Sequence, residues 1–252
     1  ISVGAPYFNT IFTPLALILL CIMGWATVLR WKSVSLSVVL KQVILMAVAL
    51  GLTWWLTDLT LQKNPVHSLQ WFPTLFISLA VWVVLTHLPY RRFMWRLKPL
   101  AMRLAHIGFA ICVIGAMMNS YYGDERGVRL KPHDSAQLAG YQFHYQQHFY
   151  DIGANYTAEG ALFEVYDKNN RHILTLTPER RYYDVRTMTM SEVGLAHLGL
   201  DDLYIVMGDK LGHKEYAFRL HYKPYVRALW LGGCLMVLAA LLALIGDRIS
   251  RR

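Results

Sequence analysis

The sequence predicts a polytopic α-helical membrane protein with an antiparallel β domain inserted before its last helix. Three observations support this fold class. Hydrophobic residues make up 55% of the 252 residues and charged residues only 16%, a balance typical of integral membrane proteins. Five almost uncharged stretches recur along the chain. Residues 123–224, between the fourth and the fifth, instead alternate apolar and polar residues in short runs. Basic residues gather in alternate connections between the apolar stretches.

Each apolar stretch is close to the roughly 20 residues that a helix needs to cross about 30 Å of hydrocarbon. The five stretches are Ile11 to Leu29, Val43 to Leu61, Trp71 to Leu88, Leu100 to Tyr121 and Tyr225 to Ile245. We therefore expect residues 1–122 to form four transmembrane helices with short loops. Residues 225–252 should form a final transmembrane helix and a tail.

Residues 123–224 alternate apolar and polar side chains in short runs with turns between them. Examples are Tyr141 to Phe149, Ala161 to Tyr166, Leu203 to Met207 and Ala217 to Tyr222. Such alternation is typical of half-buried strands. The pattern predicts a small antiparallel sandwich or barrel, held in the chain by a helix at each end.

The formal net charge of +9 is concentrated in the loops that follow the first and third stretches and in the tail. These loops share one face, which the positive-inside rule makes cytoplasmic, so the N-terminus and residues 123–224 should lie on the opposite, extracytoplasmic face. This placement indicates anchoring in a lipid bilayer and argues against nucleic-acid binding. The basic residues are Arg30, Lys32, Lys41, Arg91, Arg92, Arg96, Lys98, Arg103, Arg248, Arg251 and Arg252.

The three cysteines, Cys21, Cys112 and Cys234, fall inside apolar stretches, so we expect reduced packing residues without a disulfide. No serine, cysteine or carboxylate constellation indicates hydrolysis. The opening residues lack the basic region of a signal peptide and an initiator Met. The chain therefore looks like part of a longer protein, or one trimmed at its start.

His106 is the most informative residue, because it lies three residues after Arg103 inside the fourth apolar stretch. Ionisable side chains are costly in hydrocarbon and usually functional there. Neutral imidazole is a common haem ligand, so His106 is either an axial ligand or hydrogen-bonded to a neighbouring helix. His87 is expected at similar depth. We interpret it as an interfacial residue at a helix end, with a bis-histidine site inside this chain as the alternative.

Two groups in the β domain are weaker candidates. His144 and His148 should share one side of a sheet, as solvated residues rather than a zinc or haem site. Arg180 and Arg181 lie in a basic aromatic cluster with Tyr182, Tyr183 and Arg186. Bidentate contacts to haem propionates or to an acidic partner would suit them. Pairing within the domain, with Glu179 and Asp184, is the alternative.

Four strings resemble the C-terminal part of the CcmF family, and the likeness runs along essentially the whole chain. They are VGAPYFN at Val3 to Asn9, AHIGFAICVIG at Ala105 to Gly115, ERGVRLKP at Glu125 to Pro132 and YKPYVRALWLGG at Tyr222 to Gly233. That family supplies the haem lyase of the bacterial cytochrome c maturation system. The resemblance implies a complete protein that takes haem from the chaperone CcmE and attaches it to apocytochrome c, together with a CcmH-type subunit.

The resemblance also implies a resident b-type haem with axial histidines from two different helices. The second of these sits in a histidine–glycine context like His106 and Gly108, and Gly108 would let the porphyrin approach the helix. The first belongs to the N-terminal half of the protein, or to a separate chain. Quinol is the expected reductant of this haem, which in turn is proposed to keep the substrate haem reduced.

The tryptophan-rich haem-binding motif of the family is missing from this sequence. Trp54 and Trp55 are followed by Leu56, Thr57 and Asp58, which lack its length and glycines, so we interpret the pair as part of an interfacial aromatic belt. We therefore expect this chain alone to be inactive and not to hold the substrate haem. A quinone-linked b-type cytochrome subunit and a transporter subunit are the alternative functions.

Overall fold

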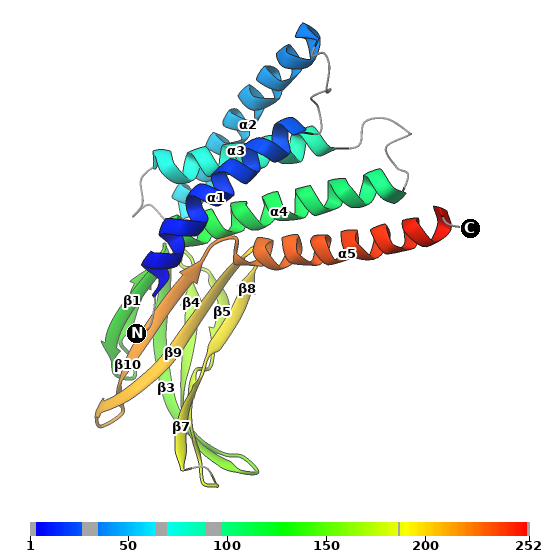
Figure 1. The fold of residues 1–252 in the computed structure, drawn as a ribbon. Helices are drawn as coiled ribbons and strands as arrows, with labels where there is room; N and C mark the ends of the chain where they lie inside the picture. Colours follow the sequence, from blue (N-terminus) through cyan, green and yellow to red (C-terminus); the bar gives the residue numbers. More distant parts are fainter. Residues whose placement is uncertain (1–3, 27–34, 64–69, 89–96, 186, 251–252) are drawn as a thin grey trace. The chain divides into compact units, whose positions relative to one another are not determined.

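The computed structural model describes residues 4–26, 35–63, 70–88, 97–185 and 187–250. The chain divides into two compact units, a helical one and one built mainly from residues 119–226 (Figure 1). Most of the basic loop residues that predict the membrane orientation lie outside the described residues, among them Lys32, Arg96 and Arg251. The same holds for Arg186 of the basic aromatic cluster.

A helix occupies each of the five apolar stretches. They are α1 Ala5–Ala26, α2 Leu36–Lys63, α3 Trp71–His87, α4 Leu97–Tyr122 and α5 Val226–Ser250. Among the described residues, three segments are long and apolar enough to cross a membrane: Leu36–Gln62, Pro99–Tyr122 and Val226–Arg248. The apolar parts of α1 and α3 are shorter, Thr10–Trp25 and Trp71–His87. The predicted combination of apolar membrane helices and an inserted β domain is confirmed, with fewer full-length spans than the five expected.

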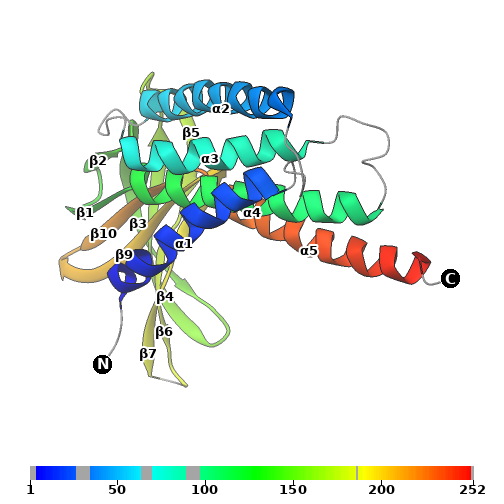
Figure 2. The same cartoon turned by 45° about the horizontal axis from the view of Figure 1, so that its top comes forward.

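Helix α3 is the most enclosed helix, and Figure 2 shows it between α2 and α4. Its Trp82 is almost fully buried and donates a hydrogen bond from Nε1 to Gln42 Oε1 of α2, at 2.9 Å. On another side, α1 presents Gly24, where an added Cβ would lie 2.0 Å from the Trp82 ring. A small residue thus lets two helices approach closely, and a side-chain hydrogen bond joins a third, as is common inside membranes.

The outward faces of α1, α2 and α5 carry large apolar side chains with little cover. Examples are Ile18 of α1, Leu40 of α2 and Val237 of α5, each more than half exposed. A soluble protein rarely exposes so much contiguous apolar surface, whereas a helix facing lipid does. These faces fit the membrane character of the sequence.

In the described residues of the second unit, ten strands form two antiparallel sheets. One sheet has the order β1-β10-β9-β8, and the other has the order β2-β3-β4-β6-β7, with β5 also paired to β4. The strands are β1 Asp124–Leu130, β2 Ser135–Leu138, β3 Tyr141–Ile152, β4 Tyr156–Tyr166, β5 His172–Leu176, β6 Glu179–Tyr183, β7 Met188–Glu192, β8 Gly194–Leu198, β9 Asp201–Gly212 and β10 Glu215–Lys223.

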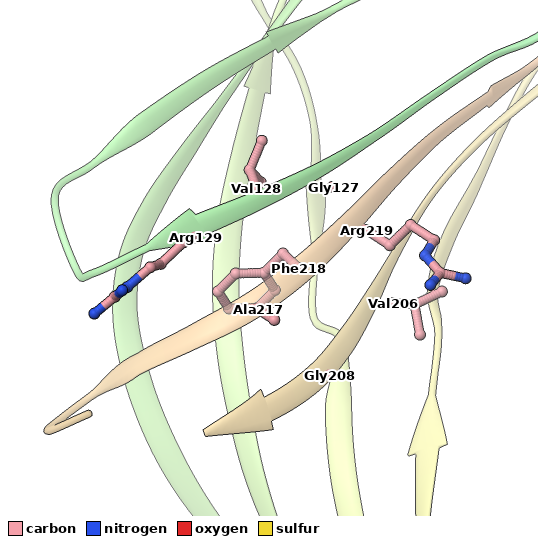
Figure 3. Close-up of a pocket in the computed structure, with 8 residues that line it drawn as sticks. All are labelled: Gly127, Val128, Arg129, Val206, Gly208, Ala217, Phe218 and Arg219. Atoms are coloured by element: carbon pink, nitrogen blue, oxygen red, sulfur yellow. The ribbon is translucent and has the colours of Figure 1, made fainter. Parts of the chain in front are cut away.

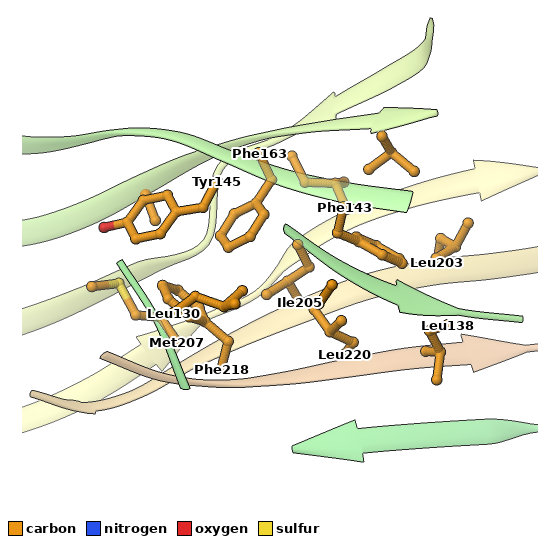
Figure 4. Close-up of a cluster of buried hydrophobic side chains, with 14 of the residues drawn as sticks. Leu130, Leu138, Phe143, Tyr145, Phe163, Leu203, Ile205, Met207, Phe218 and Leu220 are labelled. Carbon is orange, nitrogen blue, oxygen red and sulfur yellow. The ribbon is translucent and has the colours of Figure 1, made fainter. Parts of the chain in front are cut away.

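The core of the β unit is an aromatic and aliphatic layer from both sheets (Figure 4). Alternate residues of β9, Leu203, Ile205 and Met207, point into it, as the period-two pattern predicts. Phe218 of β10 meets the rings of Tyr145 and Phe163 at centroid distances of 5.2 and 4.9 Å. Contacts of this kind between inner faces are typical of a β-sandwich.

His144 and His148 do not share a side of the sheet, so that prediction is wrong. The β3–β4 register shifts between Tyr145 and Gln147, and this β-bulge inserts one extra residue into β3. An extra residue reverses the alternation of side chains beyond it. His144 packs edge-on against Tyr166 of β4, whereas His148 stacks on Tyr216 at 5.3 Å.

Mild acidification is expected to destabilise the β unit. Burial lowers the pKa of His148 below its ordinary value of 6.5, outweighing the nearby Glu159 carboxylate. Burial likewise lowers the pKa of His221, which lies 3.3 Å from Glu125. The unfolded chain therefore binds more protons than the folded unit below pH 6.5, and stability is lost as the pH falls through that range.

Circular dichroism of residues 119–226 should show a lower unfolding temperature at about pH 5 than at about pH 7. The decrease should be smaller in His148→Phe, which keeps an aromatic ring against Tyr216. An unchanged decrease in that variant would exclude His148 as a source of the pH dependence.

Candidate functional site

His106 lies on the side of α4 that faces α3, and its imidazole meets that of His87. The Nδ1 atom of His106 is 2.8 Å from the Nε2 atom of His87, and the two rings are nearly perpendicular at 84°. The Nδ1 atom of His87 is in turn 2.8 Å from the Val83 carbonyl oxygen, one turn earlier in α3. Of the four ring nitrogens, only His106 Nε2 takes no part in these two hydrogen bonds.

His87 is not the interfacial side chain that we expected. It is only 1% exposed, although it is the last residue of α3. The backbone hydrogen bond to Val83 and the contact with His106 use both of its ring nitrogens, which is how a buried imidazole avoids a desolvation penalty. The equal depth of the two histidines in the sequence was the only signal of their meeting.

The same distance argues against a bis-histidine haem site inside this chain. Two axial nitrogens lie on opposite sides of the iron, about 4 Å apart, because each metal–imidazole bond is about 2 Å long. The facing nitrogens of His87 and His106 are only 2.8 Å apart and already share a hydrogen bond. Within the described ranges, His106 Nε2 is therefore the nitrogen left for a ligand bond, and His87 is the partner that holds Nδ1.

Gly108 does not face the side of α4 that carries His106, which corrects its expected role. Two residues along an α-helix are about 200° apart, so these side chains point in nearly opposite directions. An added Cβ at Gly108 would lie 2.7 Å from the Gly232 carbonyl oxygen of α5. Gly108 therefore lets α4 and α5 cross closely, and Cys112 Sγ donates to the Leu229 carbonyl oxygen at 3.3 Å beside the crossing.

Arg103 supplies a second feature of the His106 surroundings, one helical turn before it on α4. Its Nε and Nη1 atoms are buried without a hydrogen-bond partner in the part of the chain that the structure describes. A buried, unsatisfied donor costs about 1–3 kcal/mol, and more when it is charged. An anionic group such as a haem propionate would satisfy these donors, so the residues beside His106 fit a haem. Sequence reasoning placed Arg103 only among the anchoring residues.

The two described arginines of the basic aromatic cluster, Arg180 and Arg181, contact partners within the β unit. Arg181 donates from Nε to Glu179 at 2.9 Å and lies over the Tyr156 ring at 4.4 Å. Arg180 lies 3.3 Å from Asp209. The alternative of internal pairing thus holds for Glu179, while the structure adds Asp209 as an acceptor that the sequence did not indicate.

A shallow hollow lies on the β1-β10-β9 sheet, where small residues leave the backbone uncovered (Figure 3). Arg129 and Arg219 lie at its sides, and each is paired with a carboxylate, Glu215 and Glu125 respectively. Across the described ranges, no three His, Cys, Asp or Glu side chains gather closely enough to hold a metal ion. The β unit thus offers no site comparable with the surroundings of His106.

Known proteins resemble this chain in sequence and in fold. The family description "CcmF C-terminal beta-sandwich" matches residues 121–224. The cytochrome c-type biogenesis protein NrfE of Haemophilus influenzae is 44% identical over 98% of this chain and 39% of its own length. The CcmF of Pseudomonas fluorescens is 34% identical over 98% of this chain and 38% of its own length.

A solved structure, "Cytochrome c Heme Lyase CcmF", superimposes with a TM-score of 0.73 at 17% identity, over 96% of this chain and 40% of the other. At that identity the likeness supports the fold alone. This chain therefore spans about two fifths of the length of these relatives. Its matches in sequence and in fold identify it as a C-terminal part of the CcmF family.

Proposed function

We propose that this chain is the part of a cytochrome c haem lyase that provides one axial ligand to a resident b-type haem. The observation that carries the proposal is the Nε2 atom of His106, which lies on a membrane helix and outside the hydrogen bonds of the described residues, while Nδ1 contacts His87. A haem bound there would supply one-electron transfer, which keeps the iron of the substrate haem reduced for attachment. The relatives are named as cytochrome c-type biogenesis and haem lyase proteins, which supports a role in cytochrome c maturation.

The proposal gives a role to three residues of this chain, His106, Arg103 and His87. His106 binds iron through Nε2, and Arg103 offers its buried N–H groups to a propionate. The second axial histidine comes from the remainder of the protein or from a separate chain, since His87 is committed to His106. Quinol is the proposed electron donor to the site.

The β unit has a different proposed role, as the surface that meets other proteins of the maturation system. The partners proposed are apocytochrome c, the haem chaperone CcmE and a CcmH-type subunit. The substrate haem is held by the part that carries the tryptophan-rich motif, so the chain alone does not catalyse attachment. Trp54 and Trp55 are exposed on α2, where an interfacial belt would place them.

The proposed orientation puts the β unit in the periplasm and the C-terminus in the cytoplasm of an inner membrane. Fusions at Lys32, Arg96 and Arg251 are expected to show cytoplasmic reporter activity, because basic loops stay inside. A fusion at Asp151 is expected to report a periplasmic position. Periplasmic activity at Arg96 would reverse the orientation and the side of the membrane assigned to His106.

The direct test of the proposed function is the haem content of the assembled protein with and without His106. Loss of a low-spin haem in His106→Ala would support the ligand assignment. Unchanged low-spin haem in that variant would contradict it.

A further inference from the structure

The Val83 carbonyl oxygen determines where the proton of His87 lies. A carbonyl oxygen only accepts hydrogen bonds, so the His87 Nδ1 atom at 2.8 Å must carry the proton and donate it. A neutral imidazole with its proton on Nδ1 has a lone pair on Nε2. The end of helix α3 thus presents His87 to its neighbour as a hydrogen-bond acceptor.

This acceptor determines the tautomer of His106 in the same way. His106 Nδ1 lies 2.8 Å from the lone pair of His87 Nε2, so it must be the donor of that hydrogen bond. With its proton on Nδ1, neutral His106 keeps its lone pair on Nε2. The order from Val83 through His87 to His106 is therefore a directed series of two hydrogen bonds.

The ring of His87 has little freedom to break this series. Its side chain is buried, and the helix fixes its Nδ1 contact to a carbonyl one turn earlier. Packing around α3 adds to this restraint, because Trp82 joins α2 through Gln42 at 2.9 Å. A rigid acceptor of this kind fixes both the tautomer and the orientation of the ring that donates to it.

We propose that His87 is a positioning residue, which holds His106 in the tautomer whose Nε2 atom binds iron. The proposal rests on the proposed function, since it takes His106 as an axial ligand. Metal-binding histidines usually donate their second ring N–H to an acceptor, which orients the ring and increases its basicity as a ligand. In this chain the acceptor is a second histidine, itself oriented by a backbone carbonyl.

Two variants separate the hydrogen bond from the packing. His87→Leu fills a similar volume without an acceptor, whereas the amide oxygen of His87→Gln can accept from His106 at a similar reach. In the assembled protein purified from membranes, His87→Leu should bind haem about 10- to 100-fold more weakly. The haem that remains should have a more positive midpoint potential, because a less basic imidazole stabilises the ferric state less. His87→Gln should stay close to the unchanged protein in both measurements.

An unchanged potential and haem affinity in His87→Leu would overturn the proposal. Equal defects in His87→Leu and His87→Gln would also overturn it, because they would show a packing role or direct ligation. His106→Ala, measured alongside, distinguishes a failure of the proposed function from a failure of the positioning role alone. If that variant retains its low-spin haem, the proposed function fails, whereas normal behaviour of His87→Leu beside a haem-free His106→Ala overturns only the positioning role.

A second measurement needs no haem. Nitrogen-15 NMR of the histidine-labelled protein, prepared without haem, reports which ring nitrogens carry protons. The expected result is a proton on Nδ1 of both His87 and His106, with unprotonated Nε2 atoms. A proton on Nε2 of neutral His106 would contradict the proposal whatever the spectra of the haem-loaded protein show.

Discussion

Replacing His106 by alanine is expected to remove the resident haem from the assembled protein and to reduce cytochrome c maturation at least tenfold, on the order seen when ligand support is lost. The methyl group of alanine cannot coordinate iron, so the haem would lose the ligand that this chain is proposed to provide. Haem content by pyridine haemochrome and the yield of mature cytochrome c measure the two effects.

A matched control for this variant is His144→Ala. His144 is a partly buried histidine of β3, packed against Tyr166 and remote in the chain from the α3–α4 contact. We expect its replacement to leave haem content unchanged. If His106→Ala retained normal haem and normal maturation, His106 would be a structural residue and the axial ligand would lie elsewhere.

Replacing Gly232 by leucine is expected to force α4 and α5 apart. An added Cβ would lie 2.4 Å from the Gly108 carbonyl oxygen and 2.6 Å from Cys112 Sγ. Overpacking of a close contact typically costs about 1–3 kcal/mol, and a backbone oxygen cannot move aside without shifting its helix. A lower unfolding temperature of the purified protein should reveal the effect, with weaker haem retention because α4 carries His106.

Gly233→Leu is the control, since it makes the same chemical change one residue along α5. Nothing lies within 4 Å of a Cβ built at Gly233, so the only common effect is the gain in helix propensity. We expect Gly233→Leu to be neutral or slightly stabilising. Equal losses of stability in the two variants would show that the Gly108–Gly232 crossing is not the cause.

The fold class followed from two patterns in the sequence. Long apolar stretches predicted the helices, and alternation in segments such as Leu203 to Met207 predicted the strands that form the sandwich core. The sequence predicted five membrane-spanning helices, whereas three of the described segments are long enough to span a membrane. Helix α3 is one of the shorter helices, and many of its residues are buried. A buried helix and a lipid-spanning helix have the same apolar composition.

The candidate site was only partly accessible from sequence. Position inside an apolar stretch and residue type singled out His106. Helical geometry alone places Gly108 on nearly the opposite side of the helix, although the family resemblance implied a role for it beside the haem. The partner role of His87 required a contact between two helices, which no local pattern encodes. The bulge between Tyr145 and Gln147 is a comparable case, since Phe149 and Tyr150 follow it as neighbouring aromatic residues and do not show which of them faces the core.

The optical spectrum of the assembled protein with and without His106 tests the central claim most directly. We expect a low-spin b-type spectrum for the unchanged protein and its loss in His106→Ala. Added imidazole should partly restore the spectrum by entering the space left by the side chain. A full low-spin spectrum in His106→Ala, without added imidazole and with an unchanged midpoint potential, would contradict the claim that His106 binds the haem iron.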